Sequence, residues 1–80
     1  MHFDELIKIV KERRKILLVT QESLAELSGI GLRTLKQFES GKGNLTLHSL
    51  GKLVDALGLE ICLKVKNLSV ITNEKGKNII

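Results

Sequence analysis

A very short glycine-bounded turn divides residues 21–40, and it constrains the fold more than any other feature of the sequence. Residues 21–28 carry apolar side chains at helical spacing, and Gly29 follows, free to take the left-handed conformation that ends many helices. Only Ile30 and Gly31 separate this segment from a second helical pattern over residues 32–40. We therefore predict two short helices that meet at a tight turn.

Two further helices are predicted, one on each side of this pair. The first covers residues 3–17, with acidic side chains in its first turn and basic ones in its last, as the helix dipole favours. Thr20 is the expected N-cap of the helix over 21–28, and Thr46 of a helix over 47–57. The residues expected to face the core are Leu6, Ile9, Val10, Ile16, Leu17, Leu24, Ala25, Leu27, Leu35, Phe38, Leu50, Leu53, Val54 and Leu57.

After Gly58 the hydrophobic period changes from helical to alternating, which predicts a half-buried strand over residues 59–66. Such a strand has unpaired backbone edges, so we expect it to pair with its own copy across a two-fold axis. A hairpin with a second strand at 68–72 is the alternative. The predicted dimerisation side chains are Leu59, Ile61, Leu63 and Val65.

The fold class is therefore mainly α: a bundle of four or five helices followed by a C-terminal strand that pairs across a dimer. We expect a helical domain over 1–58, a dimerisation region over 59–72 and a flexible tail over 73–80. A length of 80 residues fits one small domain.

Composition excludes several functions. A net charge of +4 gives a mild bias toward polyanionic partners. No apolar run approaches the ~20 residues of a membrane span, and no signal peptide is visible, so we expect a cytoplasmic protein. One cysteine, Cys62, excludes an internal disulfide and a multi-thiol zinc site. The sequence shows no nucleophile paired with a base, so we expect that the protein is not an enzyme and binds no metal or cofactor.

The pattern Thr20-Gln21-x-x-Leu24-Ala25-x-x-x-Gly29-Ile30, with Leu35-x-x-Phe38-Glu39-x-Gly41-Lys42 after it, resembles the helix-turn-helix of the Cro/C1 (Xre) phage-repressor family. The resemblance covers about residues 6–57. It implies a dimeric, sequence-specific DNA-binding repressor that reads a palindromic operator and is located in the cytoplasm at the nucleoid.

A narrower resemblance, to small HipB-type antitoxins, is carried by Ser40-Gly41-Lys42-Gly43-Asn44 and by Ala56-Leu57-Gly58-Leu59-Glu60 running into the strand. It implies the antitoxin of a type II toxin–antitoxin module that regulates its own operon and binds a HipA-like serine kinase toxin. A stand-alone regulator without a toxin is one alternative. A protein-interaction module of the same fold is another.

The resemblance also implies which residues contact DNA. The second helix of the motif lies in the major groove, where Arg and Gln can each grip one purine with two hydrogen bonds. The predicted base-reading residues are Leu32, Arg33, Thr34, Lys36 and Gln37. The predicted phosphate contacts are Gln21, Lys42 and Asn44. Arg13 and Lys15 are interpreted as part of a solvated face rather than as DNA contacts.

Arg14 and Glu39 occupy positions where the family carries a structural ion pair, and we assign them to the scaffold. Two departures from the family pattern are expected to have structural consequences. Leu18 stands where glycine is usual, so either a left-handed leucine costs about 1 kcal/mol or the turn differs. Gly31 replaces the usual Ser or Thr cap of the recognition helix, which weakens that helix start by roughly a few tenths of a kcal/mol.

Overall fold

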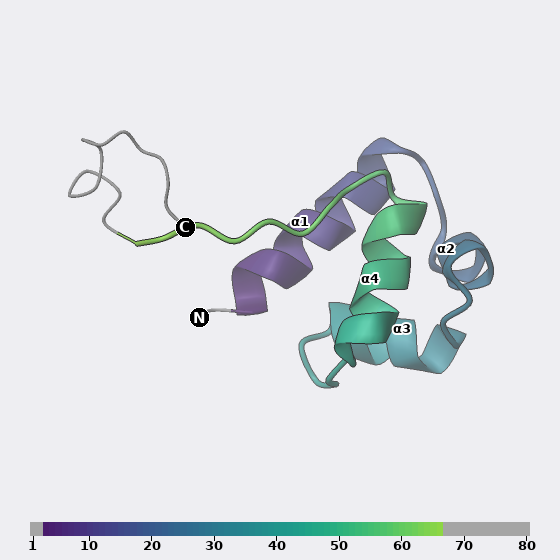
Figure 1. Cartoon of the computed structure of the whole chain (residues 1–80). Helices are drawn as coiled ribbons and strands as arrows, with labels where there is room; N and C mark the ends of the chain where they lie inside the picture. The colour runs from purple at the N-terminus through teal and green to yellow at the C-terminus, as the bar shows by residue number, and fades with distance from the viewer. Residues whose placement is uncertain (1–2, 67–80) are drawn as a thin grey trace.

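The computed structural model describes residues 3–66, and these residues contain four helices (Figure 1). The helices are α1 (Phe3–Ile16), α2 (Gln21–Ser28), α3 (Leu32–Glu39) and α4 (Leu47–Ala56). Each boundary lies within one residue of its prediction, so the mainly helical class is confirmed. No helix in the described part of the chain is long and apolar enough to cross a membrane.

Local capping explains why the helix boundaries were predictable. The hydroxyl of Thr20 accepts a hydrogen bond of 3.0 Å from the backbone N–H of Ser23, and Thr46 does the same for Ser49. Gly29 ends α2 in the left-handed conformation, with φ at 78°. Each of these residues supplies a hydrogen-bond partner to a backbone group that the end of a helix would otherwise leave unpaired.

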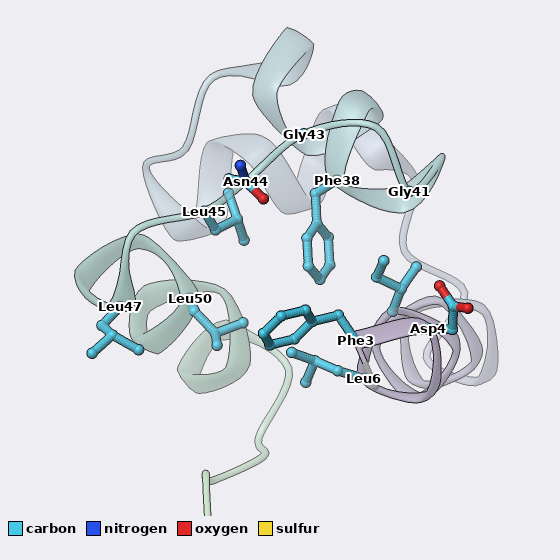
Figure 2. Close-up of a pocket in the computed structure, with 11 residues that line it drawn as sticks. Phe3, Asp4, Leu6, Phe38, Gly41, Gly43, Asn44, Leu45, Leu47 and Leu50 are labelled. Carbon is cyan, nitrogen blue, oxygen red and sulfur yellow. The ribbon is translucent and has the colours of Figure 1, made fainter. Parts of the chain in front are cut away.

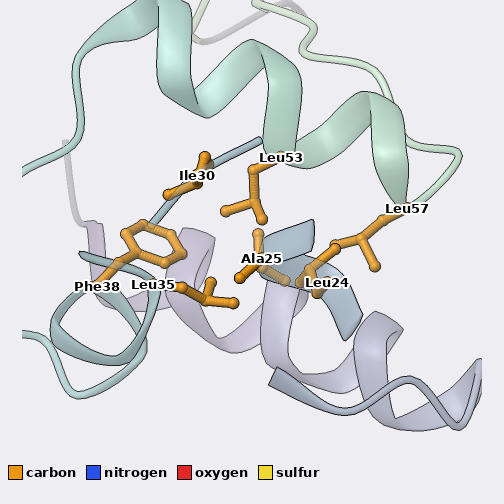
Figure 3. Close-up of a cluster of buried hydrophobic side chains, with 8 residues drawn as sticks. Leu24, Ala25, Ile30, Leu35, Phe38, Leu53 and Leu57 are labelled. Carbon is orange, nitrogen blue, oxygen red and sulfur yellow. The ribbon is translucent and has the colours of Figure 1, made fainter. Parts of the chain in front are cut away.

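The core forms where α2 packs against α3 and α4, while α1 packs against α3. Figure 3 shows side chains from α2, α3 and α4 converging on one cluster. Its buried members are Val10, Leu24, Ala25, Ile30, Leu35, Phe38, Leu53 and Leu57. Because Leu35 and Phe38 are on the buried side of α3, the opposite side of that helix faces solvent.

Some side chains predicted to be inside are exposed. Leu27 is 68% exposed because α2 buries only a narrow stripe, Leu24, Ala25 and Ser28. On a helix, Leu27 lies about 100° around from the centre of that stripe. The apolar face of α1 is also narrower than predicted: Val10 is fully buried, whereas the exposed residues are Ile9, Ile16 and Leu17.

The turn between α1 and α2 places a leucine in the left-handed region. Leu18 has φ at 59°, and its side chain is 90% exposed. Backbone hydrogen bonds hold the turn; one of them, 3.1 Å long, runs from the N–H of Val19 to the carbonyl of Arg14. Of the two alternatives for Leu18, the strained conformation is therefore the one adopted, at a cost of about 1 kcal/mol.

The described chain does not contain the predicted C-terminal strand. Residues 59–66 leave α4 as an irregular, extended trace that runs away from α2 and α3 (Figure 1), and no strand occurs in the part of the chain that the structure describes. A strand requires a hydrogen-bonded neighbour, and the described chain supplies none. Three of the predicted dimerisation side chains, Ile61, Leu63 and Val65, are exposed. The predicted second strand at 68–72 and the tail at 73–80 lie outside the described residues.

Candidate nucleic-acid interface

One face of α3 presents polar side chains to solvent as a continuous surface. Arg33, Lys36 and Gln37 are exposed, whereas Leu35 is fully buried and Phe38 is 5% exposed. Steps of three and four residues place Arg33, Lys36 and Gln37 on the same side of the helix. The sequence thus gives α3 an apolar side that fixes it to the core and a polar side that is free to bind.

These side chains line one shallow hollow of about 450 Å³, here called the reading hollow. Its lining consists of Leu32, Arg33, Lys36, Gln37 and Ser40. Leu32 is half-buried because it also packs against the core, so only part of its side chain is available. Thr34 is exposed but lies outside the reading hollow. Ser40 was not predicted to lie on this surface. It stands seven residues, or about two helical turns, after Arg33, and this spacing is the signal that would have identified it.

A network centred on Glu39 fixes α3 to the rest of the protein. The Glu39 carboxylate accepts hydrogen bonds from Arg14 Nε at 2.8 Å and Arg14 Nη2 at 2.9 Å, a bidentate salt bridge between α1 and α3. Gln21 Nε2 adds a third bond of 3.0 Å from the start of α2. A third nitrogen of Arg14 donates to the carbonyl of Val19. Glu39, on α3, therefore links this helix to both α1 and α2.

The loop after α3 folds back on the same helix. The carbonyl of Gln37 accepts hydrogen bonds from the N–H groups of Lys42 at 2.9 Å and Gly43 at 3.2 Å, and from the Ser40 hydroxyl at 2.9 Å. Gly43 approaches so closely that a Cβ there would lie 3.0 Å from the Cβ of Gln37. The absence of a side chain at Gly43 thus allows the loop to pack against Gln37 and to donate hydrogen bonds to its carbonyl.

The predicted phosphate contacts occupy three different surroundings. Gln21 is half-buried and uses one amide N–H on Glu39, which leaves its second amide N–H available. Lys42 is exposed in the loop. Asn44 lines a separate groove between the loop and α1, into which Phe3 and Phe38 both point (Figure 2). The structure therefore does not bring Lys42 and Asn44 into the reading hollow.

The described part of the chain contains no candidate metal centre. Among residues 3–66 there is no group of three or more His, Cys, Asp or Glu side chains placed to hold a metal ion. Cys62 is an exposed free thiol in the segment after α4. The chemistry that residues 3–66 do offer is hydrogen bonding and positive charge on a helix surface.

The geometry defines a class of protein: two short helices cross at a tight turn, and the second presents its polar face outward. The helix-turn-helix family model matches residues 10–63, more than half of the chain. The chain therefore belongs to the helix-turn-helix family of the Cro/C1 type. It is also 41% identical to the cryptic phage CTXphi transcriptional repressor RstR of Vibrio cholerae serotype O1, over an alignment of 89 positions that covers 88% of this chain and 80% of that relative.

Proposed function

We propose that this protein is a sequence-specific DNA-binding transcriptional repressor. The observation that carries the proposal is the polar face of α3, where Arg33, Lys36 and Gln37 line one hollow while Leu35 and Phe38 anchor the helix. A helix held in this way fits the major groove of B-DNA, which is about 12 Å wide. The similarity to a phage transcriptional repressor supports the same function.

Each exposed residue of α3 then has a defined role. Arg33 donates two hydrogen bonds to O6 and N7 of a guanine, and Gln37 pairs with N6 and N7 of an adenine. Thr34 and the exposed part of Leu32 contact thymine methyl groups. Lys36 adds positive charge beside them.

Backbone contacts fix the orientation of α3 in the groove. Gln21 donates its second amide N–H to a phosphate, and the first N–H groups of α2 point toward the same anion. Lys42 and Asn44 contact phosphates from the loop after α3. Such contacts position a protein on DNA without reading its sequence.

The segment after α4 supplies the dimer in this proposal. Ile61, Leu63 and Val65 are 52%, 81% and 62% exposed, and they alternate with polar residues. Pairing of residues 59–66 with the same segment of a second copy would satisfy the backbone groups and cover the apolar side chains. Two recognition helices related by a two-fold axis would then read half-sites about 34 Å apart, or a multiple of that distance.

The test of DNA recognition is selection of bound duplexes from a random pool by the full chain. We expect enrichment of a palindrome whose half-sites are separated by about one helical turn or a multiple of it. A pool with no enriched sequence after selection at low salt would contradict the proposal.

The dimer is tested separately by sedimentation of a chain truncated after Gly58. The full chain is expected to sediment as a dimer and the truncated chain as a monomer with much lower operator affinity. A truncated chain that remains dimeric would exclude residues 59–66 as the interface. The full chain carrying Leu63→Lys provides a second variant that keeps the chain length unchanged.

A repressor of this type acts either alone or as the antitoxin partner of a HipA-like kinase. The similarity to a phage repressor favours the stand-alone regulator. The neighbouring gene distinguishes the two, because a toxin–antitoxin pair is encoded together. A protein-interaction module that has lost DNA binding is the remaining alternative, and the random-pool selection tests it directly.

A further inference from the structure

A second hollow lies where α1 packs against α3, and here it is called the α1 hollow. Its volume is about 340 Å³, and its lining includes Lys11 and Lys15 of α1 and Gln21 of α2. Lys36 and Ser40 of α3 line both this hollow and the reading hollow. The two hollows therefore meet along α3, and the α1 hollow extends the polar surface beyond the recognition helix.

The α1 hollow carries a surplus of positive charge. Its one carboxylate, Glu39, is 5% exposed and is already held by the bidentate bond from Arg14. Arg14–Glu39 is the sole salt bridge within residues 3–66, so Lys11, Lys15 and Lys36 have no carboxylate partner there. Like charges gathered on one surface raise the local positive potential and attract an anion.

The opposite side of the same lysines is more nearly neutral. Lys11 and Lys15 also line a neighbouring hollow on the outer side of α1, together with Lys8. That hollow contains two acidic side chains, Asp4 and Glu12. The α1 hollow is therefore richer in net positive charge than this neighbouring hollow, and it adjoins the reading hollow.

We infer that Lys11 and Lys15 bind a phosphate of the DNA backbone at the α1 hollow, beside Lys36. This inference rests on the proposed function, and it adds α1 to the elements that contact DNA. A helix lying in the major groove is bordered by the phosphates of the groove walls, and a hollow that continues from the helix surface meets such a wall. The lysines then fix the tilt of α3 in the groove without reading bases.

The test compares two double variants that remove the same charge. Lys11→Gln/Lys15→Gln removes both α1 lysines from the α1 hollow and leaves Arg14 bound to Glu39. Lys8→Gln/Lys52→Gln removes two exposed lysines, neither of which lines the α1 hollow or the reading hollow. Circular dichroism checks that each variant keeps the helical content of the unmodified chain.

The measurement is affinity for the selected operator duplex, and for a random duplex, across a series of salt concentrations. A lost phosphate contact reduces the slope of log affinity against log salt by about 0.9. We expect Lys11→Gln/Lys15→Gln to lose roughly that amount per protomer and to weaken both duplexes alike. Lys8→Gln/Lys52→Gln is expected to keep the slope of the unmodified chain.

Ethylation interference locates the contact on the DNA. One phosphate per half-site whose ethylation blocks the unmodified chain should no longer matter to Lys11→Gln/Lys15→Gln. Equal salt slopes for the two double variants, or an unchanged interference pattern, would overturn the inference while leaving the proposed function intact. Failure of the unmodified chain to bind any duplex would instead refute the proposed function.

Discussion

The two ends of the recognition helix are held by different means. At its C-terminal end, Glu39 receives three side-chain hydrogen bonds from α1 and α2, and the carbonyl of Gln37 receives three more from the loop. At its N-terminal end, Gly31 provides no side-chain cap. That end is positioned instead by the short turn and by Ile30, which is 7% exposed.

This difference bears on the DNA contact that we propose for α3. Directional polar bonds at the C-terminal end fix the rotation of the helix, so that Lys36 and Gln37 point consistently outward. Apolar burial holds the N-terminal end without occupying its backbone N–H groups, which stay available to an incoming anion. The N-terminal end of α3 is therefore left open, and the C-terminal end provides the rigidity.

The largest effect is expected from Glu39→Ala, which removes the hydrogen-bond network at the C-terminal end of α3. The substitution leaves Arg14, whose side chain is 13% exposed, without its carboxylate. Removing one partner of a buried ion pair costs roughly 3–5 kcal/mol, so the free energy of unfolding should fall by that amount in urea denaturation. Glu22→Ala, at an exposed position on α2, is the control and should change stability by less than about 0.5 kcal/mol. Equal effects of the two substitutions would show that the network does not hold α3.

The next largest effect concerns base reading at the N-terminal end. Arg33→Ala should cost about 1–3 kcal/mol of operator binding and relax the preference at one base position. Lys42→Ala should weaken all sequences alike and flatten the salt dependence, because a phosphate contact carries no sequence information. Titration of specific and random duplexes distinguishes the two outcomes. Equal losses on both duplexes for Arg33→Ala would refute its base-reading role.

A smaller effect is expected from the loop that holds Gln37. In Gly43→Ala the new Cβ would lie 3.0 Å from the Cβ of Gln37, so the loop must move and its hydrogen bonds to the Gln37 carbonyl weaken. We expect a loss of stability of about 1 kcal/mol, together with weaker operator binding. Gly51→Ala is the matched control: Gly51 lies inside α4, and a Cβ at this position would meet nothing within 4 Å. It should stabilise the protein by roughly 0.5–1 kcal/mol. Thermal unfolding should therefore show a lower midpoint for Gly43→Ala and a higher one for Gly51→Ala.

The same comparison explains what the sequence could predict. Helix boundaries follow from local signals, and Thr20, Gly29 and Thr46 occupy the caps that their residue types favour. The outward face of α3 was predictable for the same reason, because Leu35 and Phe38 fix its orientation by spacing alone. These features depend on neighbours a few residues away.

Features that depend on tertiary neighbours were harder to predict. Lys15 is exposed, as a residue of a solvated face should be, but only the packing of α1 on α3 shows that it lines a hollow together with Lys36. Residues 59–66 showed the alternation of a strand, but an alternating sequence does not specify where the pairing strand is found. Leu27 was misplaced because the width of the buried stripe on α2 is set by α3 and α4, which cover only one side of it.

The smallest effect is expected from strengthening the N-terminal end with Gly31→Ser. The backbone at Gly31 is already extended, with φ at −61° and ψ at 143°, and a Cβ there would meet only the Thr34 hydroxyl, at 3.9 Å. A serine at this position can accept a hydrogen bond from the N–H of Thr34, as an N-cap does, so stability should rise by roughly a few tenths of a kcal/mol. The same hydroxyl would occupy an N–H group at the end of α3 that we propose to lie in the major groove, so operator affinity should not rise with stability. A parallel gain in thermal stability and in operator affinity would show that the open N-terminal end has no part in binding.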